Sequence, residues 1–270
     1  MWDPGQYLRY AEERSRPFFE LIGRVRADQP RLVVDLGCGP GQLTAALADR
    51  WPEAEVQGID SSAEMIAAAR QLARRPGPGA GSGGGSGGGS GSMSVALGDL
   101  RDWQPGRAPD VIVSNAVLQW VPGHEQLLAR WAGLLAPGGS LAFQVPGNFD
   151  QPGHVILREL ASSPRWRLPL AGAELNRQAA SPAQYADLLG RAGCQVDAWE
   201  TTYLHLLAGD DPVLDWYKGS GLRPVLAALP AAAAAEFLAA YGARLREAYP
   251  RAPYGTPLPF RRVFVVARRG

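Results

Sequence analysis

A glycine-rich turn holds the residues best suited to binding a ligand. It reads Asp35-Leu36-Gly37-Cys38-Gly39-Pro40-Gly41. Glycines accept positive φ angles and let a ligand approach the bare backbone, and the start of a following helix presents unpaired N–H groups. A cofactor site is therefore the first hypothesis.

The flanking residues predict a strand before this turn and a helix after it. The apolar residues 32–34 precede the turn, and the apolar positions after it recur at spacings of three and four, at Leu43, Ala46, Leu47 and Trp51. Such spacing marks one face of a helix. Strand, glycine turn and helix together are typical of nucleotide-binding folds.

The spacing of the glycines separates several nucleotide-binding motifs. A nicotinamide fingerprint reads Gly-x-Gly-x-x-Gly, and Gln42 stands where its third glycine would be. A Walker loop would continue into Gly-Lys-Ser/Thr, which does not follow here. The pattern is instead Gly-x-Gly-x-Gly, with Asp35 two residues before it.

A second acid follows the next predicted strand. Asp60 ends the run 56–59 and lies 19 positions after Gly41. An acid at the end of the second strand of a doubly wound sheet accepts hydrogen bonds from ribose hydroxyls. The alternative is a helix cap, but Ser61 and Glu64 already fit a capping box, so we favour the ribose role.

Three further polar residues are predicted at the ends of later strands. Asp99 follows the run 94–97, and Asn115 and Gln119 follow the run 110–114. In a cofactor carrying adenine, Asp99 is suited to accept from the exocyclic amine, while its alternative is an ordinary turn residue. Asn115 and Gln119 are candidates for contacting the ligand or closing the crevice.

The wider pattern is an alternation of strands and helices, which predicts an α/β fold with a mainly parallel sheet. It is interrupted at residues 76–92, which contain ten glycines and four serines. We interpret them as a flexible linker with a reach of roughly 23 Å. A helix-to-strand connection lies away from the ligand crevice, so the segment need not divide the single domain 1–270.

Composition favours a globular protein that acts on small molecules. The chain has 270 residues, 46% of them hydrophobic, with a formal net charge of +1 and two cysteines. This balance argues against nucleic-acid binding, and the lack of a long apolar span argues against a membrane segment. We expect a cytoplasmic monomer or weak homo-oligomer that needs no metal.

The turn resembles motif I of class I S-adenosylmethionine-dependent methyltransferases, and further blocks resemble the trans-aconitate 2-methyltransferase family. These blocks include Asp60-Ser61-Ser62-Ala63-Glu64-Met65, Gly98-Asp99-Leu100-Arg101-Asp102-Trp103, Pro146-Gly147-Asn148-Phe149-Asp150, Trp216-Tyr217-Lys218-Gly219 and Pro259-Phe260-Arg261-Arg262. The resemblance implies a Rossmann-like fold of seven strands with helices on both faces. A helical cap would come from about 1–26, 150–180 and 208–258.

The resemblance also implies methyl transfer from S-adenosylmethionine to a carboxylate of trans-aconitate. An aliphatic carboxylate with a pKa of about 4 is already ionised at neutral pH, so we assign no acid or base. The expected cofactor-binding residues are Asp35, Gly37, Cys38, Gly39, Gly41, Asp60, Ser61, Asp99, Leu100, Asn115 and Gln119. The expected substrate-binding residues are Tyr7, Asn148, Tyr217, Lys218, Arg223, Arg261 and Arg262.

Two of these expectations carry further detail. Lys218 is the only lysine in a chain whose other basic residues are arginines, which makes it the sharper substrate candidate. Arg261 and Arg262 are adjacent just before the last predicted strand, so we expect them to point to opposite faces and only one to reach the ligand.

Alternative functions remain open from the sequence. One is methylation of another small carboxylic acid or of a carboxylate on an acyl carrier. The other is a noncatalytic protein that binds S-adenosylmethionine as a regulator or assembly partner.

Overall fold

The computed structural model describes residues 11–73, 92–176 and 178–270, so Tyr7 and the linker residues 76–91 lie outside the described residues. Two compact units form. We call the first the sheet unit (Ser15–Val145, Ala180–Trp199, Val263–Gly270) and the second the helical unit (Met1–Arg14, Pro146–Ala179, Glu200–Arg262). The expected single domain with its cap at 1–26, 150–180 and 208–258 stays a prediction.

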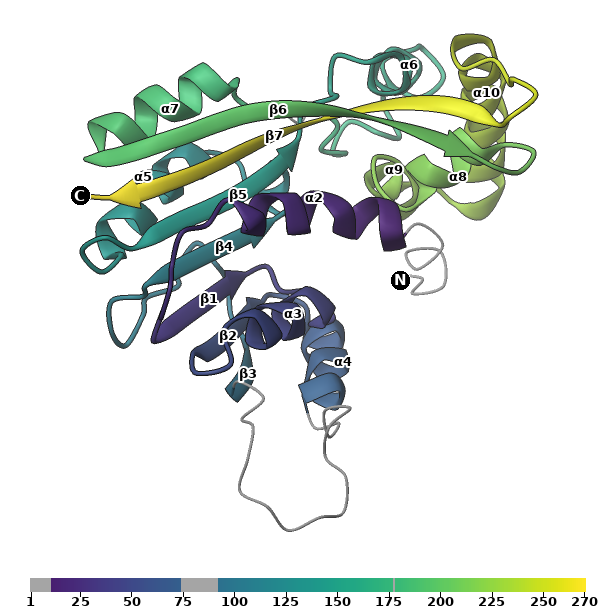
Figure 1. Ribbon diagram of the computed structural model, residues 1–270. Helices are drawn as coiled ribbons and strands as arrows, with labels where there is room; N and C mark the ends of the chain where they lie inside the picture. The colour runs from purple at the N-terminus through teal and green to yellow at the C-terminus, as the bar shows by residue number, and fades with distance from the viewer. Residues whose placement is uncertain (1–10, 74–91, 177) are drawn as a thin grey trace. The chain divides into compact units, whose positions relative to one another are not determined.

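Seven strands form one sheet in the order β3-β2-β1-β4-β5-β7-β6 (Figure 1). The pairs β1–β2, β1–β4, β2–β3 and β4–β5 are parallel, which confirms the expected α/β fold and its mainly parallel sheet. Their bounds are β1 Leu32–Leu36, β2 Glu55–Asp60, β3 Ser92–Leu97, β4 Val111–Asn115, β5 Ser140–Pro146, β6 Cys194–Leu207 and β7 Thr256–Arg269.

The last strand runs against its neighbour β5. The amide of Arg269 donates to Gly139, and the amide of Gly147 donates to Arg261, so the two strands advance in opposite directions. The predicted last strand was also too short, because Arg261 and Arg262 lie inside β7 rather than before it. Similarly, Ser92 belongs to β3 and not to the linker.

Helices in the sheet unit pack apolar side chains onto the strands. Leu47 on α3 is fully buried, as the predicted helical spacing requires, and Trp131 on α5 is fully buried as well. The bounds are α2 Ala11–Gly23, whose first residues belong to the helical unit, α3 Gln42–Arg50, α4 Ala63–Ala73, η1 Leu118–Trp120, α5 His124–Leu134 and α7 Pro182–Arg191.

The helical unit has an apolar core of its own. Trp216, Phe237 and Tyr241 are among its largest buried side chains, and α6 packs against α10. Its helices are α6 Pro152–Ala161, α8 Pro212–Lys218, α9 Arg223–Ala228 and α10 Ala231–Ala248. Two tyrosines bracket the start of α6: the amide of Gly153 donates to the Tyr249 hydroxyl, and the Tyr241 hydroxyl donates to the Gly153 carbonyl.

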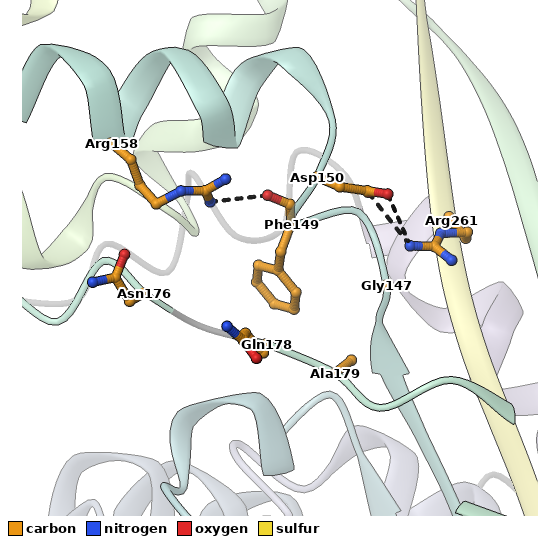
Figure 2. Close-up of a pocket in the computed structure, with 8 residues that line it drawn as sticks. All are labelled: Gly147, Phe149, Asp150, Arg158, Asn176, Gln178, Ala179 and Arg261. Carbon is orange, nitrogen blue, oxygen red and sulfur yellow. Dashed lines mark hydrogen bonds and ion pairs between the residues drawn. The ribbon is translucent and has the colours of Figure 1, made fainter. Parts of the chain in front are cut away.

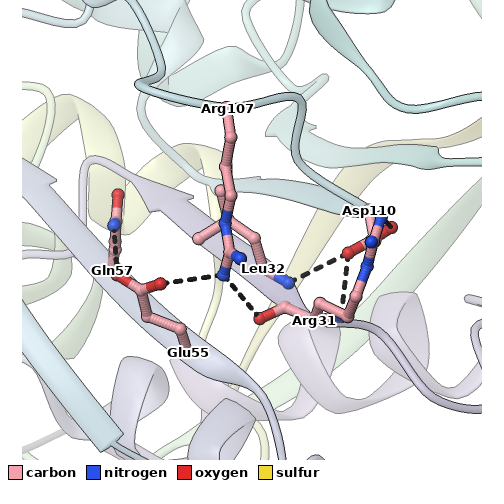
Figure 3. Close-up of polar contacts among 6 residues, drawn as sticks. All are labelled: Arg31, Leu32, Glu55, Gln57, Arg107 and Asp110. Atoms are coloured by element: carbon pink, nitrogen blue, oxygen red, sulfur yellow. Dashed lines mark hydrogen bonds and ion pairs between the residues drawn. The ribbon is translucent and has the colours of Figure 1, made fainter.

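A polar cluster fixes the amino ends of three strands (Figure 3). The Asp110 carboxylate accepts from the amides of Arg31 at 2.8 Å and Leu32 at 3.0 Å. Arg107 donates to the Arg31 carbonyl and, at 2.8 Å, to the Glu55 carboxylate. These contacts hold the starts of β1, β2 and β4 in register, while the glycine turn follows the opposite end of β1.

Within the described ranges, no helix combines the length and apolar character that crossing a membrane requires. The same residues contain no group of three or more His, Cys, Asp or Glu side chains placed to hold a metal ion.

Candidate cofactor and substrate sites

The three glycines of the turn all have positive φ, at +88° for Gly37, +54° for Gly39 and +87° for Gly41. Two of them also permit close packing, because a Cβ on Gly37 would clash with Val117 and one on Gly41 would lie 2.9 Å from Ala69. Gly39 differs, since nothing lies within 4 Å of its ideal Cβ position. The open space over Gly39 is where a ligand can approach the backbone.

Asp35 is buried at the end of β1, and its carboxylate accepts a 2.7 Å hydrogen bond from the Thr44 hydroxyl on α3. The pKa of Asp35 is raised to about 6, chiefly because the carboxyl is buried. The hydrogen bond from Thr44 opposes this rise, and the charge of nearby Asp60 adds to it. Asp35 is therefore mostly ionised at neutral pH. Sequence reasoning missed Thr44, because its partner is not visible from local spacing.

Cys38 is buried within the turn. Burial, followed by the charges of Asp35 and Asp60, raises the pKa of its thiol well above the ordinary value. The side chain is therefore a protonated thiol, which fills space beneath the turn and is not a nucleophile.

Asp60 joins the turn to the next helix. Its two carboxylate oxygens accept from the amide of Gly39 at 2.9 Å and from the amide of Ser62 at 2.8 Å. Each oxygen retains a second lone pair for a ligand hydroxyl. The capping box predicted on Ser61 is wrong: Ser61 is exposed, and Ser62 accepts from the Met65 amide before α4 begins at Ala63.

Asp99 sits in a turn after β3 and contacts Arg101. The amide of Arg101 donates to one carboxylate oxygen at 2.9 Å, and the guanidinium donates to both oxygens, with a shortest distance of 2.5 Å. The guanidinium bonds lower the pKa of Asp99. The turn role considered from the sequence is thus present, and the adenine contacts of Asp99 and the partly buried Leu100 stay predictions.

The turn after β4 has an unusual backbone. Ala116 has a φ of +57°, the one positive value among described residues other than glycine. Gln119 donates to the Ala116 carbonyl at 2.6 Å, and Gln144 on β5 donates to the Asn115 side-chain oxygen at 2.7 Å. Strain of this kind gathers at ligand sites. Gln144 was missed, although one polar residue inside the apolar run 141–145 was a signal.

The predicted substrate residues fall into two groups within the helical unit. The first group comprises Asn148, which follows the end of β5, and Arg261 and Arg262, which lie in β7. Arg262 is buried, and its guanidinium lies 4.9 Å from the centre of the Phe260 ring. The buried Asn148 side-chain oxygen has no hydrogen-bond partner in the described part of the chain. As expected from strand alternation, Arg261 is the more exposed arginine.

The second group lies on α8 and at the start of α9. Tyr217 is buried, and burial raises the pKa of its phenol. Lys218 forms a 3.0 Å ion pair with Asp215 and keeps about a third of its side chain exposed, at 30%. Arg223 begins α9 and is exposed. None of these three lines the cavity that Arg261 lines.

That cavity has a volume of about 380 Å³ (Figure 2). Sequence reasoning missed most of its polar residues, among them Arg158 on α6. Its lining residues are Gly147, Phe149, Asp150, Arg158, Asn176, Gln178, Ala179 and Arg261.

The three histidines are held by other contacts. His124 lies 2.7 Å from the Tyr185 hydroxyl, His154 packs between the rings of Phe149 and Tyr217, and His205 stacks on Trp216. Each is buried. These environments explain the histidines as core residues without invoking catalysis.

Comparison with solved structures shows the fold. The YcgJ protein from Bacillus subtilis aligns with a TM-score of 0.59 over 96% of this chain and 98% of that chain, at 13% identity. The [4+2]-cyclase SpnF aligns with a TM-score of 0.56 over 94% of this chain and 81% of that chain, at 17% identity. At such identities the likeness establishes the architecture alone.

Comparison with sequences shows the family. A family model described as a methyltransferase domain matches residues 9–198. The trans-aconitate 2-methyltransferase of Streptomyces avermitilis is 53% identical over 99% of this chain and 97% of its own length. The enzyme of the same name from Rhodococcus jostii is 51% identical over 99% of both chains. With identity of this level running through both units, the chain is a methyltransferase that belongs to the trans-aconitate 2-methyltransferase family.

Proposed function

We propose that the protein transfers the methyl group of S-adenosylmethionine to one carboxylate of trans-aconitate, forming the monomethyl ester. The observation that carries this proposal is the identity of about half of all residues, across 99% of the chain, with enzymes of that name. The identity includes the helical unit, where the expected substrate residues lie. Identity confined to the sheet unit would support a methyltransferase but would not indicate its substrate.

The residues of the sheet unit fit the cofactor. S-adenosylmethionine, when bound, supplies an electrophilic methyl group on a sulfonium. Asp60 is suited to accept from the ribose hydroxyls, and Asp99 with Leu100 to bind adenine. The open backbone at Gly39 suits the approach of the ligand, and the carboxylates of Asp35 and Asp60 complement its cationic groups. Gly37, Cys38, Gly41, Ser61, Asn115 and Gln119 complete the proposed set.

The substrate needs positioning and charge neutralisation rather than proton transfer. Its carboxylates are ionised at neutral pH, because their pKa values are about 4. Holding a nucleophile in line with a methyl group can supply roughly 7 kcal/mol or more. Arginine donates two parallel bonds to a carboxylate, and lysine offers a compact charge. The proposed partners are Tyr7, Asn148, Tyr217, Lys218, Arg223, Arg261 and Arg262.

A methyl-transfer screen tests the proposed activity. The full chain is incubated with radiolabelled S-adenosylmethionine and a panel of small carboxylic acids and an acylated carrier protein. We expect label in trans-aconitate as a base-labile ester. Preferential labelling of another acid or of the carrier protein would show that trans-aconitate is not the preferred substrate. Tight cofactor binding with no labelled product would favour a noncatalytic role.

Steady-state kinetics of Lys218→Ala test the first substrate residue. We expect loss of trans-aconitate turnover with an unchanged dissociation constant for S-adenosylmethionine. Asp215→Asn is the matched control, because it breaks the same ion pair but leaves the ammonium in place. Normal turnover in Lys218→Ala would remove this residue from the substrate site.

A further inference from the structure

We propose that the cavity in Figure 2 is a carboxylate clamp, in which Arg158 and Arg261 each bind one non-reacting carboxylate of the substrate. The identity of the substrate rests on the proposed function. The clamp assigns a substrate-binding role to Arg158 on α6, which lies outside the sequence blocks that carry the family resemblance. It also predicts that the protein selects polycarboxylates over monocarboxylates.

The two guanidinium groups reach the cavity from different elements. Arg158 comes from α6 and Arg261 from β7. In Figure 2 they lie on opposite sides of the Phe149 ring, with Arg158 toward α6 and Arg261 toward the strand. Two cationic groups on either side of a small cavity match a ligand that carries carboxylates at both ends. A single carboxylate would engage one of them and leave the other without an anionic ligand.

Arg158 is held in place and still has donors to offer. One terminal nitrogen donates to the Phe149 carbonyl at 2.9 Å. This bond uses one N–H group, while a guanidinium carries five N–H donors. The bond orients the planar group and leaves donors for a bidentate contact with a carboxylate.

Arg261 is held loosely by two acids. Its contacts with Asp150 are 3.4 Å long and its contact with Glu200 is 3.3 Å long. Charge-assisted hydrogen bonds of this kind are normally about 2.7–2.9 Å, so both contacts are weak. A third of the Arg261 side chain is exposed, at 33%. An incoming carboxylate therefore replaces long contacts with short ones.

The remaining lining suits a small unsaturated acid. The Phe149 ring points into the cavity and offers an apolar surface to the carbon skeleton, while the amides of Asn176 and Gln178 stand nearby (Figure 2). A volume of about 380 Å³ lies at the lower end of ligand sites, which start at roughly 300 Å³. The third carboxylate stays free of Arg158 and Arg261, whose charge would weaken it as a nucleophile.

The decisive variant is Arg158→Met, which removes the charge and keeps much of the apolar stem. We expect the KM for trans-aconitate to rise about tenfold or more, since hydrogen bonds to charged groups are worth about 1.5–3 kcal/mol. The KM for S-adenosylmethionine and the melting temperature should stay close to wild type. Arg158→Lys should recover part of the loss, because lysine keeps the charge but not the bidentate fork.

Arg167→Met is the matched control. Arg167 is exposed in the same unit and does not line the cavity, so its loss changes the net charge equally. We expect its KM for trans-aconitate to stay within about twofold of wild type. If Arg158→Met also leaves the KM for trans-aconitate unchanged, or if both variants raise this KM by the same factor, the clamp is wrong.

A binding measurement separates the clamp from the proposed function. Titration calorimetry uses tricarballylate, a saturated tricarboxylate, and crotonate, a monocarboxylate, with S-adenosylhomocysteine present. Arg158→Met should weaken tricarballylate binding about tenfold and crotonate binding far less. If the wild type makes no ester of trans-aconitate but this difference persists, the proposed function fails and the clamp stands. If the ester forms and tricarballylate binding does not depend on Arg158, the clamp fails and the function stands.

Discussion

The hydroxyl of Thr44 donates to the carboxylate of Asp35 at 2.7 Å, and both side chains are buried. This bond ties the end of β1 to the first turn of α3 beneath the glycine turn. It gives the buried acid a partner that lowers its pKa, although burial dominates and leaves the pKa at about 6. The first acid of the motif is therefore a structural charge as well as part of the proposed cofactor site.

Replacing Asp35 with asparagine should change how stability depends on pH. Because the folded-state pKa is raised from 3.8 to about 6, the carboxyl contributes stability that is fully present below the unfolded pKa and is lost as the pH rises through 6. Relative to wild type, the free energy of unfolding of Asp35→Asn should therefore improve by about 2 kcal/mol between pH 4.5 and pH 7.5. Urea unfolding at both pH values measures this difference, and a difference that does not change with pH would contradict it.

The glycines of the turn should respond differently to alanine. Gly37→Ala meets Val117 as well as an unfavourable φ, so we expect a loss of about 2 kcal/mol or more in the free energy of unfolding. At Gly39 an added Cβ meets open space, so Gly39→Ala should lower the free energy of unfolding by about 1–2 kcal/mol, through the unfavourable φ alone. In Gly39→Ala the new methyl group occupies the proposed approach path of the ligand. The loss in binding free energy for S-adenosylmethionine should therefore exceed the loss in the free energy of unfolding. Chemical denaturation and calorimetry compare the two, and full affinity in Gly39→Ala would move the ligand away from Gly39.

Asp60→Ala should weaken S-adenosylmethionine binding about ten- to hundredfold, because the carboxylate serves the ribose and also accepts from the Gly39 amide. Isothermal titration measures the dissociation constant. Asp49→Ala, which removes an exposed acid from the same unit, is the control and should bind normally. Unchanged affinity in Asp60→Ala would remove the ribose assignment.

Asp150→Asn should act in the opposite direction to the loss of Arg158. Asp150 is exposed and contacts Arg261 at 3.4 Å, so its removal frees the guanidinium and lowers repulsion of an anionic substrate. We expect the KM for trans-aconitate to fall about two- to fivefold, in keeping with the modest strength of exposed ion pairs. Glu247→Gln, an exposed acid outside the cavity, is the kinetic control. A KM that rises in Asp150→Asn would mean that this acid orients Arg261 rather than competing for it.

The fold was predictable because its signals are local. The apolar runs, the glycine turn and the alternating helices each appear in a short window of sequence, and the parallel pairs of the sheet follow from them. The direction of β7 could not be predicted from these local signals, because it depends on pairing with β5, which lies more than a hundred residues earlier in the chain. The full length of β7 was also missed, because its first residues, 256–262, carry prolines and arginines and lack the continuous apolar run of its end.

The site residues that belong to a sequence motif were predictable. Those whose roles depend on a hydrogen-bond partner on another element of the fold were not. The cap was predicted at Ser61, and the hydrogen bond from the Met65 amide to the Ser62 hydroxyl places it one residue later. Thr44 and Gln144 act through partners that lie on other elements. Arg158 is one arginine among many, and only the cavity in Figure 2 distinguishes it.

The position of β7 between β5 and β6 has a consequence for biosynthesis. This strand is translated after every other strand of the sheet, yet it fills an interior position. Until it leaves the ribosome, β5 and β6 each present an unpaired edge, and exposed edges are templates for pairing with other chains. The nascent chain therefore exposes these edges until β7 emerges, and slow synthesis of β7 would lengthen the time in which they can pair with other chains.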